Sequence, residues 1–577
     1  MRKHILWIIV LISLAYINAL SGGFIYDDYA GIVDNGFIKS SRNIPLIFSR
    51  RYLTHPLEAA FNLGAYNIGS GEGSYRPVAT LSYFLNYSIF KLDPFGWRLT
   101  NLAIHTSCAI LIYLLLNTLF AKPLASLFSA IIFGLSPVNA EVINCTIFRS
   151  NSLALLFCLL AINLYFRARL EQKKTRHYYL AASLISAFLA AFSKEIAVIL
   201  PLALILCEYY RLKSDRQAVL KNCKIYSLYF LVEALYIIIY FAMMPPAQGI
   251  FSLQGIYLNL MRMFYVMGIY LKGILFPADL LLIDPAEVFR SFAVMLLGIS
   301  AFVLAAYVVC RKNKFPPEVS FGVIWFLLWL LPMNNFINSF RIIAAYRYLY
   351  VAMPGFAVLA GFTLSRIWLA RTRMPVLQRL LPLACFGYFA IFAVSANASW
   401  KNDMILNMSI VEKNPNSIYA HINFGDTLLK YGDIEGAKRE LSFVLVKPRP
   451  FKYGGLETSV AYSNLGSIYM VEGDYSKAEK MYRQALELTP HVAYIYAKLG
   501  FCYAQQGLYE KALDYLNKAK SINPYFAPAY LNAGITYELM KKYTQAKSEF
   551  TQALKINPDY GQARDYLIGL DRLGKRK

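Results

Sequence analysis

A long series of apolar runs limits the fold of this chain more than any other feature. Of its 577 residues, 57% are hydrophobic, which is too many for a single soluble domain of this length. A membrane-spanning helix needs about 20 apolar residues, so the ends of the shorter runs are loosely defined. We expect an all-α, polytopic membrane domain over residues 1–400 with about eleven spans. The runs are 5–20, 99–120, 124–138, 151–166, 178–192, 195–210, 225–244, 291–310, 319–333, 347–365 and 380–397.

Basic residues are concentrated in the connections between these runs. The net charge of +24 would otherwise suggest a nucleic-acid partner, but four clusters at Arg167–Arg176, Arg211–Lys224, Arg311–Lys314 and Arg366–Arg379 carry much of it. All four fall on one side if the first loop faces outward, as the positive-inside rule expects. The charge is therefore a topology signal, and no nucleic-acid partner is predicted.

One segment affects this topology. Residues 256–276 are long enough to span, but Arg262 and Lys272 interrupt them. A crossing there would move Arg311–Lys314 to the outer side. We therefore interpret the segment as an outward amphipathic or re-entrant helix. The odd number of spans places the start of the chain inside and its end outside.

The last third of the chain is a set of helical repeats. Gly466, Gly500 and Gly534 are spaced by 34 residues. Each is followed, at the same distances in every unit, by a tyrosine, two alanines and a closing proline. This pattern resembles the tetratricopeptide repeat, which stacks into an α-solenoid. A degenerate unit around Gly425 and Ala437 precedes them, with an insertion near Lys447–Gly455.

We predict a linker over residues 401–416, a repeat domain over 417–577 and a capping helix over 560–573. Such a solenoid offers a groove for a protein. A purely stabilising scaffold and a docking site for substrate or partner both remain open.

Two adjacent aspartates, Asp27 and Asp28, follow the first apolar run. Carboxylates at the end of a membrane helix are costly, so they usually have a function. An aspartate there is able to take a proton from a hydroxyl, hold a metal or pair with a cation. The alternative is that the pair only caps the following loop.

Isolated basic residues also lie at the outer ends of the runs: Arg76, Arg149, Lys194 and Arg347. Together they would form a basic cavity at membrane level, which suits a lipid-linked phosphate. Supporting candidates are Tyr75, His105, Glu141 and Glu195. The alternatives are a snorkelling arginine, a local pair between Lys194 and Glu195, and a core histidine at His105.

The order of these short motifs resembles one family. The motifs are, in chain order, Tyr26-Asp27-Asp28, Tyr75-Arg76-Pro77, Asn101 with His105, Pro137 and Glu141 with Arg149, Lys194-Glu195 and Arg347-Tyr348-Leu349-Tyr350. Their order is similar to that in the transmembrane-and-tetratricopeptide-repeat O-mannosyltransferases of the GT-C class. This chain departs from the family pattern at Ser136, Asn151 and Tyr346, which leaves the sugar and the metal requirement open.

The resemblance implies transfer of a sugar, such as mannose, from a polyprenyl-phosphate donor to a hydroxyl at the outer face. It gives Asp27 or Asp28 the role of base. It also gives Arg76, Arg149, Lys194 or Arg347 the role of holding the donor phosphate, with Arg347 preferred. The expected reaction is a single displacement with inversion.

The acceptor is a protein, docked by the repeats, or a cell-envelope glycan. The expected location is a bacterial cytoplasmic membrane, among membrane lipids, with the repeats in the periplasm. No metal-ligand cluster of His and Cys is seen in the sequence, and the cofactor is left open. The alternative is a non-catalytic, membrane-anchored repeat scaffold for envelope assembly.

Overall fold

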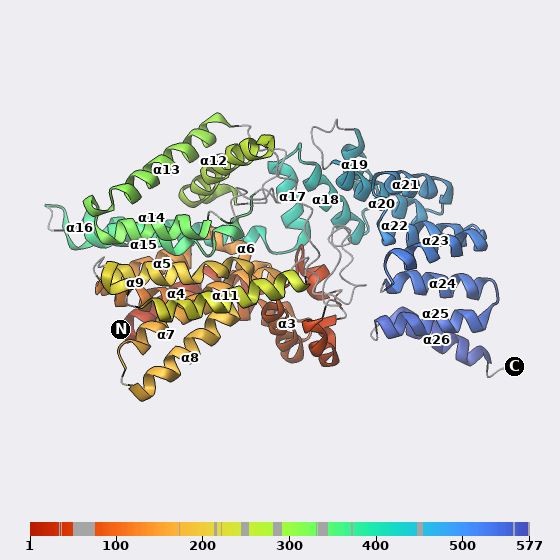
Figure 1. Ribbon diagram of the computed structural model, residues 1–577. Helices are drawn as coiled ribbons and strands as arrows, with labels where there is room; N and C mark the ends of the chain where they lie inside the picture. The colour runs from red at the N-terminus through yellow and green to blue at the C-terminus, as the bar shows by residue number, and fades with distance from the viewer. Residues whose placement is uncertain are drawn as a thin grey trace. The chain divides into compact units, whose positions relative to one another are not determined.

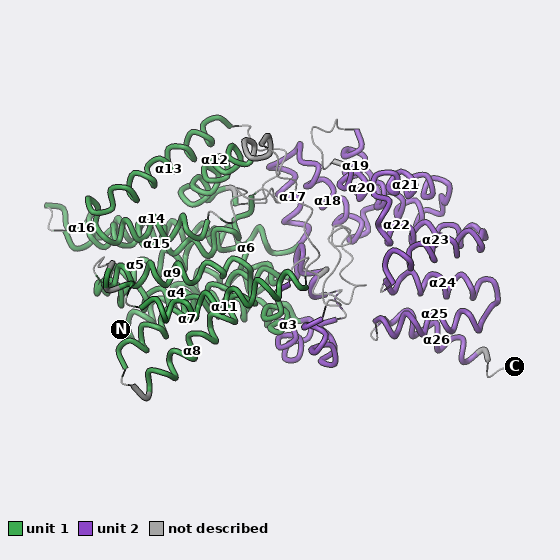
Figure 2. Tube along the Cα trace, viewed as in Figure 1, with its two compact units in different colours: residues 1–23, 76–82, 93–402 green, residues 24–75, 83–92, 403–577 purple. Residues whose placement is uncertain are grey.

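The computed structural model describes residues 1–33, 35, 37–49, 75–171, 173–212, 216–220, 222–243, 253–280, 291–330, 332, 344–370, 373–446, 454–524, 526–557 and 560–574. These residues form two compact units (Figure 2). The first unit contains residues 1–23, 76–82 and 93–402, and the second contains 24–75, 83–92 and 403–577. Each unit is described by itself.

The first unit is a bundle of apolar helices (Figure 1). Each of the eleven predicted runs overlaps an α-helix in its described residues. The helices are α1 (Arg2–Tyr16), α4 (Pro94–Phe120), α5 (Pro123–Leu135), α6 (Ala140–Asn144), α7 (Arg149–Ala168), α8 (Lys173–Ala191), α9 (Leu200–Arg211), α10 (Arg216–Leu220), α11 (Cys223–Met243), α12 (Leu253–Leu275), α13 (Phe292–Cys310), α14 (Pro317–Leu330), α15 (Met353–Leu369) and α16 (Pro375–Ser399).

Among the described residues, six helices are long and apolar enough to cross a membrane, and a seventh is added if the bent pair of α5 with Pro137–Asn144 is one span. The helices α14 and α15 are apolar but shorter. The prediction of an all-α, multi-pass membrane domain is confirmed. The total of eleven spans stays a prediction.

The basic connections meet at one end of the bundle. Arg211 donates a hydrogen bond of 3.3 Å to the carbonyl of Thr118. Glu318, at the start of α14, is paired with both Lys122 and Arg366. These contacts bring the connections after α4, α9, α13 and α15 together. The connections that carry three of the four basic clusters thus lie at one end of the bundle, and the side of the membrane that they face stays a prediction.

Arg98 organises the opposite end of the bundle. It lies near the start of α4, and a helix of 27 residues is about 40 Å long. Its guanidinium donates to the carbonyls of Ala19, Gly23 and Trp400 and to the side chain of Asn144. Gly22 leaves room for this guanidinium, because a Cβ there would lie 2.3 Å from Arg98 Nη1. Arg98 thus joins the two points at which the chain leaves the bundle.

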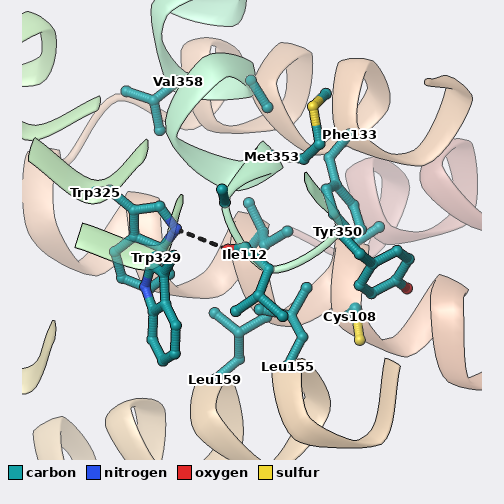
Figure 3. Packing of buried hydrophobic residues seen from close by; sticks show 14 of the residues in the cluster. Cys108, Ile112, Phe133, Leu155, Leu159, Trp325, Trp329, Tyr350, Met353 and Val358 are labelled. Atoms are coloured by element: carbon teal, nitrogen blue, oxygen red, sulfur yellow. Dashed lines mark hydrogen bonds between the residues drawn. The ribbon is translucent and has the colours of Figure 1, made fainter. Parts of the chain in front are cut away.

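The apolar core lies between α4, α5, α7, α14 and α15. Figure 3 shows Trp325 and Trp329 beside Ile112, Leu155 and Leu159. The indole N–H of Trp325 donates a 3.2 Å hydrogen bond to the carbonyl of Val351, so the buried ring has a polar partner. This packing fixes α15 and the segment just before it, which carries Arg347.

The segment predicted as a re-entrant helix is α12. Its backbone meets α13 at two glycines, since a Cβ on Gly268 or Gly298 would clash with the main chain of the other helix. Its last turn lies against Tyr346, because a Cβ on Gly273 would be 2.3 Å from that ring. The α12 helix therefore supports the Arg347 segment. Its re-entrant character stays a prediction.

The second unit contains the repeats. Each repeat glycine packs on the residue 16 positions later: Gly425 on Leu441, Gly466 on Tyr482, Gly500 on Leu516 and Gly534 on Phe550. The degenerate first unit therefore folds like the others. The helices are α17 (Asp403–Lys413), α18 (Ile418–Lys430), α19 (Ile434–Val446), α20 (Gly454–Val471), α21 (Tyr475–Leu488), α22 (Ala493–Gln505), α23 (Tyr509–Ile522), α24 (Ala527–Leu539), α25 (Tyr543–Ile556) and α26 (Gly561–Gly574).

The prediction of an α-solenoid ending in a further helix agrees with α18–α26. The predicted linker 401–416 contains the helix α17, and most of the predicted insertion at 447–455 lies outside the described residues. The domain boundaries 1–400, 401–416 and 417–577 stay a prediction. The acidic loop after α1 belongs to the same compact unit as the repeats, as does most of α3 (Pro77–Phe90).

Candidate functional site

Among the described residues of the first unit, the most enclosed ion pair joins Arg347 to Glu141. The Glu141 carboxylate accepts a 2.8 Å hydrogen bond from the backbone N–H of Arg347 and a second one from its guanidinium. The two side chains are only 7% and 5% exposed. The guanidinium also lies 4.2 Å from the ring of Phe148. Glu141 therefore fixes both the backbone turn and the direction of the Arg347 side chain.

A second pair joins Arg76 to Glu195. Two hydrogen bonds of 3.0 and 2.7 Å connect the guanidinium to both carboxylate oxygens. Burial alone would raise the pKa of Glu195, but the charge and hydrogen bonds of Arg76, with the nearby charge of Lys194, lower it to about 2. Glu195 is therefore ionised at any physiological pH. Glu195 thus has a long-range partner in Arg76, which the alternative of a local pair with Lys194 did not include.

Lys194 connects these two pairs. Its ammonium donates to the amide oxygen of Asn151 and lies 5.4 Å from the ring of Tyr348. The guanidinium of Arg347 lies 5.2 Å from that same ring. Lys194 and Arg347 therefore gather around Tyr348, although 153 positions separate them in the sequence. The structure thus brings Arg76, Lys194 and Arg347 into one cluster with Glu141 and Glu195.

Arg149 is buried beside this cluster and is held by neutral groups. Its Nε donates a 2.6 Å hydrogen bond to Asn101, and its other nitrogens donate to Ser82 and to the carbonyl of Trp97. The side chain is fully buried. This arrangement favours Arg149 as a brace between α4 and α7. Its predicted contact with a donor phosphate has no support from these hydrogen bonds.

His105 lies in the apolar core. Its Nδ1 is 2.8 Å from the hydroxyl of Tyr350, and its Nε2 is 3.0 Å from the carbonyl of Gly134. Its ring also contacts those of Tyr16 and Phe133. The core-histidine alternative thus describes His105 better than a supporting role in chemistry.

The acidic pair belongs to the second unit. Asp28 is fully buried, and one of its carboxylate oxygens accepts a 3.3 Å hydrogen bond from the backbone N–H of Ile25. Asp27 is half-buried, and its carbonyl accepts a 2.9 Å bond from Gly31. Tyr75 is buried too, which raises the pKa of its hydroxyl. The prediction that the acidic pair faces the basic cluster stays a prediction.

No group of three or more His, Cys, Asp or Glu side chains suited to a metal occurs among the residues that the structure describes. The chemistry visible in the first unit is cationic: Lys194 and Arg347 lie around the ring of Tyr348, and Arg76 is paired with Glu195, the residue next to Lys194. Such a cluster is able to hold a phosphate, since arginine and lysine donate several charge-assisted hydrogen bonds.

Sequence reasoning gave Asn151 and Tyr348 no role in the cluster, and it missed Asp403 entirely. Asn151 was recognised only as a departure from the family pattern, yet it is the hydrogen-bond partner of Lys194. Asp403 follows the last apolar run, just as Asp27 follows the first. The same signal, a carboxylate directly after a span, would have found it.

Two models of the tetratricopeptide repeat match residues 457–524 and 527–560. The repeat domain predicted from the sequence therefore contains tetratricopeptide repeats. A Thermus thermophilus tetratricopeptide-repeat protein of known structure is 19% identical and covers 32% of this chain and 93% of its own, but its TM-score of 0.26 is too low to support an argument.

Several curated relatives carry one name. Protein O-mannosyl-transferase Tmtc1 of Drosophila melanogaster is 29% identical over 198 residues, which are 34% of this chain and 21% of that protein. Human protein O-mannosyl-transferase TMTC3 is 26% identical over 29% of this chain and 17% of its own length. The predicted resemblance to this family is confirmed.

A third relative, protein O-mannosyl-transferase Tmtc2 of Drosophila melanogaster, is 27% identical over 42% of this chain and 25% of its own length. The matched regions thus span only 17% to 25% of the length of these relatives. What those proteins do is therefore a hypothesis for this chain.

Proposed function

We propose that this chain is a membrane glycosyltransferase that moves a sugar from a polyprenyl-phosphate donor to a hydroxyl group of a protein. The buried cluster of Arg76, Lys194 and Arg347 is the observation that carries the proposal. It lies at the end of the bundle opposite to the basic connections, which the positive-inside rule assigns to the cytoplasm. The reaction would then occur at the outer face of the membrane.

In the proposed reaction the acceptor oxygen forms a bond to the anomeric carbon as the bond from that carbon to the phosphate oxygen breaks. The hydroxyl proton passes to the carboxylate of Asp27 or Asp28. The bonding electrons leave with the polyprenyl phosphate, whose added charge Lys194 and Arg347 stabilise. A single displacement of this kind inverts the anomeric centre.

The names of the relatives support a protein acceptor and mannose as the sugar to test first. The tetratricopeptide repeats support docking of that acceptor. We place the repeats on the outer side, since the chain leaves the bundle at Trp400, at the end marked by Arg98. A bacterial cytoplasmic membrane with periplasmic repeats remains the proposed setting.

The test is transfer of mannose from polyprenyl-phosphate mannose to a peptide rich in serine and threonine, using the purified full-length protein. Asp27→Asn combined with Asp28→Asn should lower kcat by about 10²- to 10⁴-fold, because asparagine keeps the size of aspartate but is a very poor base. Asp514→Asn, an exposed carboxylate of α23, is the matched control.

Wild-type transfer by the double variant would contradict the mechanism. A wild-type protein that binds donor and peptide but transfers nothing would favour the alternative, a membrane-anchored repeat scaffold without catalytic activity.

A further inference from the structure

The backbone just before the acidic pair is in a conformation that tyrosine rarely adopts. Tyr26 has a φ of +52°, in the left-handed region that favours glycine and asparagine. A residue held there depends on its surroundings, and such residues are concentrated at functional sites. A turn of π-helix, also frequent at functional sites, follows directly over Tyr29–Val33.

Asp403, the first residue of α17, holds this turn. Its Oδ1 accepts a 2.7 Å hydrogen bond from the backbone N–H of Tyr26. Its Oδ2 accepts a 2.8 Å hydrogen bond from Lys430, the last residue of α18. The carboxylate is largely buried, so its hydrogen bonds compete little with water. Asp403 thus joins the acidic loop to α17 and α18.

Two further contacts connect the loop to α18. The ammonium of Lys430 lies over the ring of Tyr29, and the hydroxyl of Tyr26 is hydrogen-bonded to that of Tyr419. Tyr419 and Lys430 are eleven residues apart, which is close to three helical turns, so they share one face of α18. Burial alone would lower the pKa of Lys430, but its hydrogen bonds to Asp403 and Tyr29 raise it, which keeps the lysine charged.

The tyrosines on both sides of the acidic pair are therefore held by one connected group, Tyr26 by Asp403 and Tyr419, and Tyr29 by Lys430. Upstream, the N–H of Gly23 donates a 2.9 Å hydrogen bond to the carbonyl of Lys401. Residues 23–26 thus run beside residues 401–403, with Tyr26 bonded to Asp403 just before the acidic pair begins. This register leaves little freedom for the position of Asp27 and Asp28.

We propose that Asp403, Tyr419 and Lys430 are positioning residues that fix the acidic pair through Tyr26 and Tyr29. The proposal rests on the proposed function, in which Asp27 or Asp28 is the base. The degenerate first repeat then has a role apart from docking: it sets the geometry of the base. A movement of α17 or α18 when acceptor binds would change the rate of transfer.

The test compares Asp403→Ala with Asp403→Asn in the full-length protein. Alanine removes both hydrogen-bond acceptors, whereas asparagine keeps a side-chain oxygen for the N–H of Tyr26. A misplaced catalytic group commonly costs about 100-fold. We expect kcat to fall by about 10- to 100-fold in Asp403→Ala and by less in Asp403→Asn, with the KM for donor changed less than about twofold. Glu549→Gln, which breaks a repeat ion pair with Lys520, is the control.

Hydrogen exchange separates positioning from loss of folding. A protein that is merely unfolded exchanges faster throughout, whereas a loop released by Asp403→Ala exchanges faster only locally. Exchange of residues 24–33 should become faster in Asp403→Ala and stay unchanged in Glu549→Gln, while the core helix α5 should exchange as in wild type in both variants.

Two results would overturn this inference and leave the proposed function standing, provided that the wild type is active and needs Asp27 or Asp28. The first is a wild-type kcat in Asp403→Ala. The second is unchanged exchange of residues 24–33 in that variant. A wild type without transfer would instead refute the proposed function. The exchange measurement then still decides whether Asp403 holds the loop.

Discussion

Charged side chains have different settings in the basic cluster of the first unit and in the local ion pairs of the repeats. In the first unit, Arg347, Glu141 and Lys194 are buried, and their partners come from distant parts of the chain. In the repeats, pairs such as Lys477 with Asp474 are exposed and three residues apart. Exposed pairs contribute about 0–1 kcal/mol, whereas breaking a buried pair costs several times more. Because a buried charge is costly to keep, its presence indicates a function. An exposed local pair costs little and serves mainly to keep the surface soluble.

The largest effect expected from this contrast is that of Lys194→Met. The substitution keeps the length of the side chain and removes the charge that would bind the donor phosphate. Since a hydrogen bond to a charged group is worth about 1.5–3 kcal/mol, kcat/KM for donor should fall by about 10- to 100-fold. Kinetics with varied donor will measure this. Lys520→Met in the repeats should leave kcat/KM for donor unchanged, and an equal loss in both variants would remove the contrast.

Asn151→Asp should have a smaller effect in the same place. The new carboxylate has the shape of the amide that now accepts from Lys194, so it would pair with the lysine and compete with the donor phosphate. We expect the KM for donor to rise about tenfold. Asn151→Ala, which adds no charge, should not raise it. A lower KM in Asn151→Asp would show that Lys194 does not contact the phosphate.

In the repeats the sensitive positions are small residues. A Cβ on Gly500 would lie 2.8 Å from Leu516 and 3.1 Å from the carbonyl of Ala512. Gly500→Ala should therefore lower the free energy of unfolding of the repeats by about 1–3 kcal/mol, measured by chemical denaturation. Gly569→Ala in α26 has open space around it and should be neutral or slightly stabilising. Equal destabilisation by both substitutions would contradict this packing.

The smallest effect concerns pH. Because the pKa of Glu195 is lowered from 4.5 to about 2, its pair with Arg76 stabilises the fold above pH 4.5, and this stability is lost as pH falls toward 2. The Tm of wild type should therefore fall more steeply between pH 4.5 and 2 than that of Glu195→Gln. Glu510→Gln, at an exposed carboxylate, should follow wild type. Parallel curves for wild type and Glu195→Gln would show that the pair adds no stability.

The repeats were predictable because their signal is periodic. Gly466, Gly500 and Gly534 recur every 34 residues because each of them packs against the side chain 16 residues later in the same repeat. The helical membrane domain was predictable for a similar reason, since apolar length is a property of each segment alone. The basic residues at the site were found individually from their places at the ends of apolar runs.

The partners of those residues were not predictable. Glu141 was expected beside the same cavity as Arg347, but nothing in the sequence indicates that these two residues pair across 206 positions, and nothing near Tyr26 indicates Asp403. Arg149 and His105 have the same sequence setting as Lys194 and Arg347, yet Arg149 is hydrogen-bonded to Asn101 and His105 lies among core side chains. Burial and hydrogen-bond partners distinguish these roles, and both arise only when the helices pack.

The sequence alone therefore determined the kind of molecule: a basic-ended bundle of membrane helices, an acidic pair after the first helix, and a solenoid of tetratricopeptide repeats. These features depend on the composition and period of single segments. The tertiary structure decided which charges meet, because hydrogen bonds and ion pairs require atoms within about 3–4 Å. Only the packing of helices far apart in the chain brought Lys194 to Tyr348 and Asp403 to Tyr26.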